Sequence, residues 1–321
     1  MKQVLLSALA ILAVTAVSAA EFPSRVVLKI GSTSTSSWAV VGEVVRDHIG
    51  NFLPGKPTIE TEIVDGARGM QLARQMVSTE PTDGSVFSMM STSILQNYVL
   101  DPSVFDFSPE GVHWIGSLAK TVSYCVTKKG TPTTLTDEGL VFGSSNKQSN
   151  FYTNAALIRH LVNPSASIVV GFKNETELVA ALDRGEIGAY CGPTRSTYER
   201  EGRASTQAIA GALGRPDAIA ALGVPDVFAN VTGFDRQAVD LALTSTVLFY
   251  GMVLPPDASP ETVEIYRNAF TAMNADPAFQ TDIKAKIAEY APMSGPEVEA
   301  FMKTLLTTDP AVVAHALELL K

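Results

Sequence analysis

Short apolar runs alternate with stretches of helical periodicity along most of this sequence, and this alternation restricts the possible folds more than any other feature. Strands are expected at residues 25–30, 58–64, 85–90, 139–142, 167–172 and 187–191. Helices are expected where apolar residues recur at helical spacing, at residues 38–52, 70–78, 152–162 and 175–184. Strands that alternate with helices favour parallel sheets built from strand–helix–strand units. The sequence therefore predicts an α/β fold.

Two long apolar segments, residues 114–127 and 244–253, interrupt this rhythm. They fall near one-third and three-quarters of the chain, where two extended crossovers between lobes would lie. The tail that follows Pro260 has an almost wholly helical pattern. The sequence thus predicts two lobes, residues 21–120 plus 248–321 and residues 121–247.

The N-terminus has the three-part layout of a secretory signal. Lys2 gives a short positive start, residues 4–17 are apolar, and Ser18-Ala19-Ala20 supplies the small side chains that a signal peptidase needs before Glu21. The alternative is an uncleaved anchor, but the apolar run is shorter than the roughly 20 residues that a membrane span requires. We expect residues 1–20 to be removed near Ala19-Ala20 and the mature protein to be soluble in the periplasm.

Charge and cysteine content exclude several classes of function. The net charge is −9, and it becomes −10 when Lys2 leaves with the signal peptide. Such an acidic chain is a poor candidate for nucleic acid, whose partners carry a basic face. Cys125 and Cys191 are compatible with one disulfide or with two separate buried thiols. There is no CxxC motif and no Cys/His cluster, so a metal site is not expected.

A search for catalytic motifs finds little. The four histidines, at positions 48, 113, 160 and 315, accompany no recognisable nucleophile motif, and GxSxG, GxGxxG and Walker sequences are absent. Each histidine is better read as a surface or core residue. We expect neither catalysis nor a cofactor.

Small, hydroxyl-rich loops follow several of the expected strands and precede expected helices. A helix start has unpaired N–H groups and a partial positive charge, so it can hold an anion without a cationic side chain. In open α/β sheets such loops meet at the carboxyl ends of the strands. The candidate ligand-binding residues are Ser32, Thr33, Ser34, Thr35, Ser36, Ser37, Gly66, Ala67, Arg68, Gly69, Ser91, Thr92, Ser144, Ser145, Asn146, Ser149 and Asn150.

The alternative for each loop is ordinary helix capping, because Ser, Thr and Asn are common N-cap residues. Six consecutive hydroxyl residues at positions 32–37 exceed the need of one cap, and the pattern recurs in both halves of the chain. These two facts favour ligand binding. Arg68 either pairs with a ligand carboxylate or is a solvated loop charge.

With these loops in place, the mature chain resembles the solute-binding receptors of tripartite tricarboxylate transporters, the Bug-type periplasmic proteins. The family's first loop, Pro-Phe-Ala-x-Gly-Gly-x-x-Asp, corresponds to residues 31–39 here. Its later motifs resemble, in order, Val64-Asp65-Gly66-Ala67-Arg68-Gly69, Pro81-Thr82-Asp83-Gly84, Phe142-Gly143-Ser144-Ser145, Gly171-Phe172-Lys173-Asn174, Gly185-Glu186-Ile187, Val224-Pro225-Asp226-Val227-Phe228 and Leu254-Pro255-Pro256.

The resemblance adds Phe172, Lys173 and Asn174 to the candidate ligand-binding residues. The sequence departs from the family pattern where Thr35-Ser36 replaces a glycine pair and Ala39 replaces an aspartate. In the family that loop helps to hold the ligand's carboxylate, so the ligand preference of this chain is expected to be unusual.

The resemblance implies a type II periplasmic-binding-protein fold with the ligand cleft between two lobes. It implies capture of a small organic carboxylate by a monomer that serves membrane transporter subunits on other chains. Two alternatives stay open: a sensor subunit for a membrane signalling kinase, and a hydrolase or lyase on a similar scaffold. We further expect Cys125 and Cys191 to lie on neighbouring strands of the second lobe and to form a disulfide, because both fall on strand-like runs of an exported protein.

Overall fold

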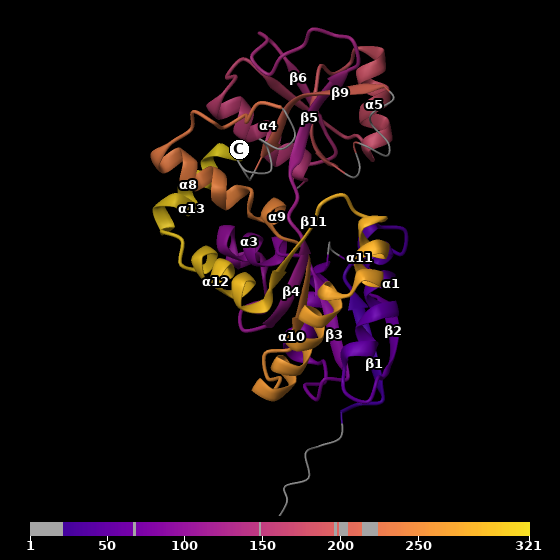
Figure 1. Ribbon diagram of the computed structural model, residues 1–321. Coiled ribbons are helices and arrows are strands. Elements are labelled where there is room, and N and C mark those ends of the chain that lie inside the picture. Colours follow the sequence, from indigo (N-terminus) through magenta and orange to yellow (C-terminus); the bar gives the residue numbers. More distant parts are fainter. Residues whose placement is uncertain (1–21, 67–68, 148, 196–197, 199–204, 214–223) are drawn as a thin grey trace, which may run out of the picture.

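The computed structural model describes residues 22–66, 69–147, 149–195, 198, 205–213 and 224–321. The expected signal peptide, Ala67 and Arg68 lie outside these residues. The described chain contains two groups of strands, one above the other in Figure 1. It has the two-lobed α/β architecture that the sequence predicted.

The larger group is a six-stranded sheet in the order β11-β4-β10-β3-β1-β2. Its strands are β1 (Arg25–Ile30), β2 (Thr58–Ile63), β3 (Val86–Met90), β4 (His113–Ala119), β10 (Phe249–Leu254) and β11 (Tyr290–Ser294). The helices around it are α1 (Ser37–Ile49), η1 (Gly50–Phe52), α2 (Met70–Ser78), α3 (Ser93–Leu100), η3 (Pro102–Val104), α10 (Pro260–Ala275), α11 (Pro277–Lys284) and α12 (Gly295–Leu306).

Parallel pairing holds in only half of this sheet. β1 runs parallel to β2 and β3, as expected, whereas β10 is antiparallel to both β3 and β4, and β11 is antiparallel to β4. The expected parallel pairing is therefore present in only part of the structure. The reason is topological: β4 takes the chain out to the second group of strands and β10 brings it back, so the two run in opposite directions.

The second group is built from β5 (Ser123–Lys128), β8 (Tyr190–Thr194) and β9 (Thr206–Leu213), which pair in the antiparallel order β8-β5-β9. Two parallel strands, β6 (Val141–Ser144) and β7 (Ser167–Val170), join this sheet through a bridge between Phe142 and Ala189. Its helices are α4 (Asn150–Leu161) and α5 (Glu175–Arg184). Cys125 and Cys191 face each other on β5 and β8 and form a disulfide.

Three further helices lie where the two groups meet: α8 (Gly233–Ala242), α9 (Thr244–Val247) and α13 (Pro310–Leu319). The C-terminal helix α13 packs on α8, α3 and α4. One apolar cluster accordingly includes side chains of both groups, among them Trp114 of β4 and Phe142 of β6. A second cluster lies between the large sheet and helices α1 and α10.

Several expected boundaries differ from the structure. Residues 244–253 are not one extended pass, because α9 forms a helical turn before β10. The tail is not wholly helical, since β11 adds to the edge of the large sheet. β6 begins later than expected because Gly139, with φ of 68°, makes a turn. β8 likewise starts at Tyr190 rather than at residue 187.

Candidate ligand-binding site

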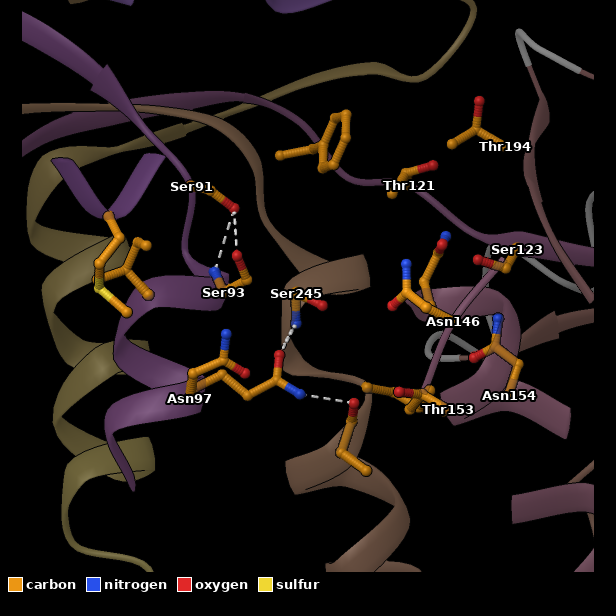
Figure 2. Close-up of a pocket in the computed structure, with 17 residues that line it drawn as sticks. Ser91, Ser93, Asn97, Thr121, Ser123, Asn146, Thr153, Asn154, Thr194 and Ser245 are labelled. Atoms are coloured by element: carbon orange, nitrogen blue, oxygen red, sulfur yellow. Dashed lines mark hydrogen bonds between the residues drawn. The ribbon is translucent and has the colours of Figure 1, made fainter. Parts of the chain in front are cut away.

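A cavity of about 660 Å³ lies between the two groups of strands. Figure 2 shows that polar side chains enter it from both sides. The described residues that line it are Met70, Ser91, Ser93, Ile94, Gln96, Asn97, Thr121, Ser123, Asn146, Asn150, Thr153, Asn154, Thr194, Ala242, Leu243, Ser245 and Phe249.

Every polar side chain in this lining is a hydroxyl or an amide, and none of the described lining residues is charged. Hydroxyls and amides both donate and accept hydrogen bonds without changing charge near neutral pH. The five apolar members, Met70, Ile94, Ala242, Leu243 and Phe249, supply contact surface between these groups. A cavity of this kind suits a small polar ligand.

One wall is the start of helix α3, directly after strand β3. The backbone N–H of Ser93 donates to Ser91 Oγ at 3.3 Å, and the two serine hydroxyls lie 2.7 Å apart. The preceding residue, Thr92, is buried and its hydroxyl donates to the Leu248 carbonyl at 2.9 Å. Ser91 and Ser93 both line the cavity, so the N-terminal end of α3 lies at this wall.

A buried amide fixes this wall to the returning chain. Gln96 Nε2 donates to the Ala242 carbonyl at 2.7 Å, and Gln96 Oε1 accepts from the Ser245 N–H at 2.9 Å. Both bonds are drawn in Figure 2. The side chain thus joins α3 to the end of α8 and the start of α9, and it holds Ser245 at the cavity.

The facing wall is the start of helix α4. Ser149 caps this helix by accepting from the Tyr152 N–H at 3.3 Å, and its hydroxyl also donates to the Asn146 carbonyl at 2.8 Å. Ser144 Oγ lies 2.9 Å from Ser149 Oγ in the interior. Neither serine lines the cavity, but together they hold the loop that presents Asn146.

The strand ends beside α4 complete this wall. Asn150 Nδ2 donates to the Gly192 carbonyl at 3.2 Å, and Asn154 Nδ2 donates to the Cys191 carbonyl at 3.1 Å. Thr121 enters from the link between β4 and β5, Ser123 from the start of β5, and Thr194 from the end of β8. The Cys125–Cys191 disulfide joins these same two strands.

The structure brings only part of the predicted set to the cavity. Ser91, Asn146 and Asn150 line it, and Thr92, Ser144 and Ser149 lie immediately behind it. Gly69 is the N-cap residue of α2 and precedes the lining residue Met70. Ala67 and Arg68 are not among the described residues.

Other predicted residues lie outside the cavity lining. Ser36 accepts from the Ala39 N–H and caps α1, and Asn174 accepts from the Glu177 N–H and caps α5. Lys173 is exposed beside Glu177. The remaining predicted residues outside the lining are Ser32, Thr33, Ser34, Thr35, Ser37, Gly66, Ser145 and Phe172.

Sequence reasoning missed Gln96, Asn97, Thr121, Ser123, Thr153, Asn154, Thr194 and Ser245. Most of these lie within a helix or at the end of a strand rather than in a loop. One available signal was the recurrence of amide and hydroxyl side chains at helical spacing in residues 146–154.

Within the described chain there is no group of three or more His, Cys, Asp and Glu that would suit a metal ion. Nor does any described helix combine the length and apolarity needed to cross a membrane.

No protein-family model matches the chain, and no curated protein matches it. Several solved structures are similar to this chain in fold. A TctC solute binding protein from Polaromonas, without ligand, superposes with a TM-score of 0.68 at 14% identity, covering 93% of this chain and 98% of that one. The periplasmic binding protein BugD gives 0.60 at 15% identity, covering 93% and 98%. MatC from Rhodopseudomonas palustris, with bound malate, gives 0.57 at 15% identity, covering 94% and 100%. This chain therefore has the fold of the TctC and Bug-type periplasmic solute-binding proteins.

Proposed function

We propose that this chain is a periplasmic solute-binding protein that captures a small organic carboxylate for a tripartite tricarboxylate-type transporter. The observation that carries the proposal is the meeting of two helix starts, α3 and α4, at one uncharged polar cavity. Each helix start contributes a partial positive charge, which favours an anion. Serine and threonine hydroxyls add neutral donors.

The ligand is held without reaction. The cavity lining in the described chain offers no acid, base or activated nucleophile. The shared fold supports the same conclusion, because two of the similar solved structures are named as binding proteins and a third holds bound malate. We propose a monomer in which residues 21–120 plus 248–321 form one lobe and residues 121–247 the other.

Export follows from the proposed role. Residues 1–20 act as a signal peptide that is removed near Ala19-Ala20, and the mature chain works in the periplasm. There it hands its ligand to membrane subunits encoded on other chains. The Cys125–Cys191 disulfide suits that oxidising compartment.

The test is a thermal-shift and calorimetric screen of the mature protein. The panel holds mono-, di- and tricarboxylates, with the corresponding amides and alkylamines as controls. A ligand that binds only the native state raises the midpoint of unfolding in proportion to the logarithm of its concentration above Kd. We expect at least one carboxylate to do so while its amide does not. Stabilisation by amines or amides, with none by any carboxylate, would contradict the proposal.

A further inference from the structure

Strand β8 carries a bulge just before it reaches the cavity. Cys191 pairs with Cys125 of β5, and Thr194 pairs with Ser123. The two pairs are three residues apart on β8 but only two apart on β5, so Gly192-Pro193 lies opposite a single residue of β5. One extra residue in one strand of an antiparallel pair is a β-bulge. Proline cannot donate to a strand ladder, and within a sheet it is tolerated at such a place.

The bulge determines the direction in which Thr194 points. Side chains of a regular strand alternate between two faces, so residues three positions apart lie on opposite faces. Directly opposed residues share a face. Cys125 and Ser123 share one face of β5, so their partners Cys191 and Thr194 share it too. Ser123 and Thr194 both line the cavity, and Figure 2 shows them on the same wall. In a regular register Thr194 would point to the other face of the sheet.

The start of helix α4 packs on this bulge. Asn150 Nδ2 donates to the Gly192 carbonyl at 3.2 Å, and Asn150 Oδ1 accepts from the Phe151 N–H at 3.1 Å. One turn later, Asn154 Nδ2 donates to the Cys191 carbonyl at 3.1 Å. Two successive carbonyls of β8 are thus bonded to α4. Asn150 itself lines the cavity, so its position there depends on the contact between α4 and the bulge.

Gly192 has no room for a side chain. A Cβ at this position would lie 2.6 Å from Cε1 of Phe151, well inside the 3.5–4.0 Å at which carbon atoms attract one another. The backbone of Gly192 is not left-handed, so glycine is needed here for space rather than for conformation. An added methyl group would push the first turn of α4 away from β8 and lengthen the bond from Asn150.

We propose that Gly192 is a positioning residue for the ligand-binding cavity. It leaves room for the ring of Phe151, so that α4 lies close to the bulge, and this contact holds Asn150 and Thr194 at the cavity wall. Bulges next to functional sites re-aim side chains in this way. The inference rests on the proposed function only in taking the cavity as the ligand site, since the geometry of the wall does not depend on the chemistry of the ligand.

Two glycine variants form a matched pair for the test. Gly188 precedes β8, a Cβ there would lie 2.6 Å from Leu140 Cδ1, and the residue does not line the cavity. Calorimetry with succinate, malate, glutarate and citrate selects the tightest of these ligands for the unmodified mature protein. Gly192→Ala should bind it about tenfold or more weakly, as expected when a ligand hydrogen bond is lost. Gly188→Ala should stay within about twofold of the unmodified protein, because its clash is remote from the site.

A second change separates positioning from a loss of overall stability. Phe151→Ala removes the ring that residue 192 would meet. The affinity of Gly192→Ala/Phe151→Ala should be no lower than that of Phe151→Ala alone, whereas a general loss of stability would add to it. Urea unfolding shows whether each variant is folded under the conditions of binding. If Gly192→Ala does not fold, Thr194→Val takes its place. It removes the hydroxyl that the bulge turns to the cavity, and it should bind the same ligand about tenfold more weakly.

Equal affinity of Gly192→Ala and Gly188→Ala would overturn the inference and leave the proposed function standing. So would a loss in Gly192→Ala that persists after Phe151→Ala, or an unchanged affinity in Thr194→Val. Binding of none of the four carboxylates by the unmodified protein would count against the proposed function instead. Hydrogen exchange without ligand then decides the inference: amides of residues 151–154 should exchange faster in Gly192→Ala than in Gly188→Ala, and equal exchange would overturn it.

Discussion

Tyr250 has a φ of 59°, a left-handed conformation that bulky side chains rarely adopt, and it lies directly beside the cavity residue Phe249. Successive side chains of a regular strand point to opposite faces. Here both aromatic rings contact Trp38, at 5.2 Å and 5.0 Å between ring centroids. The strained residue therefore places two consecutive rings against one tryptophan and fixes Phe249 at the cavity.

Ser93 and Ser36 allow a matched comparison at the residue scale. Ser93 lines the cavity, whereas Ser36 caps α1 outside it. Ser93→Ala should cost about 1–3 kcal/mol of binding free energy, because a ligand oxygen loses its donor. Ser36→Ala should leave the affinity unaltered and lower the free energy of unfolding by about 1 kcal/mol through loss of the cap. Calorimetry and urea unfolding of both variants measure these effects, and an affinity loss confined to Ser36→Ala would contradict the site.

Gln96 acts between elements, since it joins α3 to the end of α8 and to α9. Gln96→Leu leaves the Ala242 carbonyl and the Ser245 N–H without this partner in the interior. We expect it to lower the free energy of unfolding by about 2–4 kcal/mol, from one to two unsatisfied buried groups. Urea denaturation measures the loss. Gln237→Leu, on the exposed side of α8, is the control and should change stability little; equal stability of the two variants would contradict the role of Gln96.

The disulfide joins Cys125 of β5 to Cys191 of β8, two cysteines that are 66 residues apart in the sequence. Cross-linking a loop of that length disfavours the unfolded state, with a typical effect of about 2–4 kcal/mol. The double variant Cys125→Ser/Cys191→Ser should therefore unfold at a lower temperature than the oxidised protein. Reducing agent should lower the midpoint of the oxidised protein and have no effect on the variant. Two free thiols in the unreduced protein, found by mass spectrometry, would refute the bond.

A helix or strand could be predicted from the sequence only where its own residues showed a regular apolar pattern. Helices α2 and α5 begin and end where the periodicity predicted, because each carries a regular apolar stripe. The edge strand β11 was missed because its burial is only partial and shows no alternation. β10 and β11 pair antiparallel with strands far away in the sequence. Such long-range pairing cannot be predicted from the local pattern of apolar residues.

The ligand-binding site was harder to predict than the fold, because long-range contacts decide which residues reach the cavity. Hydroxyl-rich loops were predictable as helix starts, but residues 32–37 are exposed or half-buried and lead into α1 outside the cavity lining. By contrast, Thr121 and Ser123 reach the cavity only because the chain crosses there between the two groups of strands. Asn154 lies within a helix, and its side chain donates to the carbonyl of Cys191, 37 positions later in the sequence.

At the scale of the whole molecule, the uncharged lining predicts a simple dependence on pH. No described lining residue titrates near neutrality, and a monocarboxylic acid with a pKa of about 4 is almost fully ionised above about pH 6. The affinity for a carboxylate should therefore stay constant from about pH 6 to 9 and fall below that range as the ligand gains a proton. Calorimetry across this range measures it. A step in affinity near pH 6.5 would show that a histidine takes part in binding.

The two proposed lobes are expected to close on the ligand. The chain passes between the proposed lobes twice, through residues 120–122 after β4 and through the short helix α9 before β10. Two such passes can absorb a rotation while the packed sheets move as rigid bodies. A ligand that contacts both cavity walls favours the closed state, because only that state satisfies all of its hydrogen bonds.

Binding should therefore reduce the radius of gyration and leave the content of helix and strand unchanged. Small-angle scattering and far-ultraviolet circular dichroism of the mature protein, at saturating carboxylate, measure the two quantities. The corresponding amide, which should not bind, is the control for solvent effects. α13 packs on α3 of one proposed lobe and on α4 and α8 of the other, so it must slide over one of them during closure. If the radius of gyration stays constant while calorimetry shows saturation, α13 holds the two groups of strands in one fixed arrangement and the cavity is already formed before the ligand arrives.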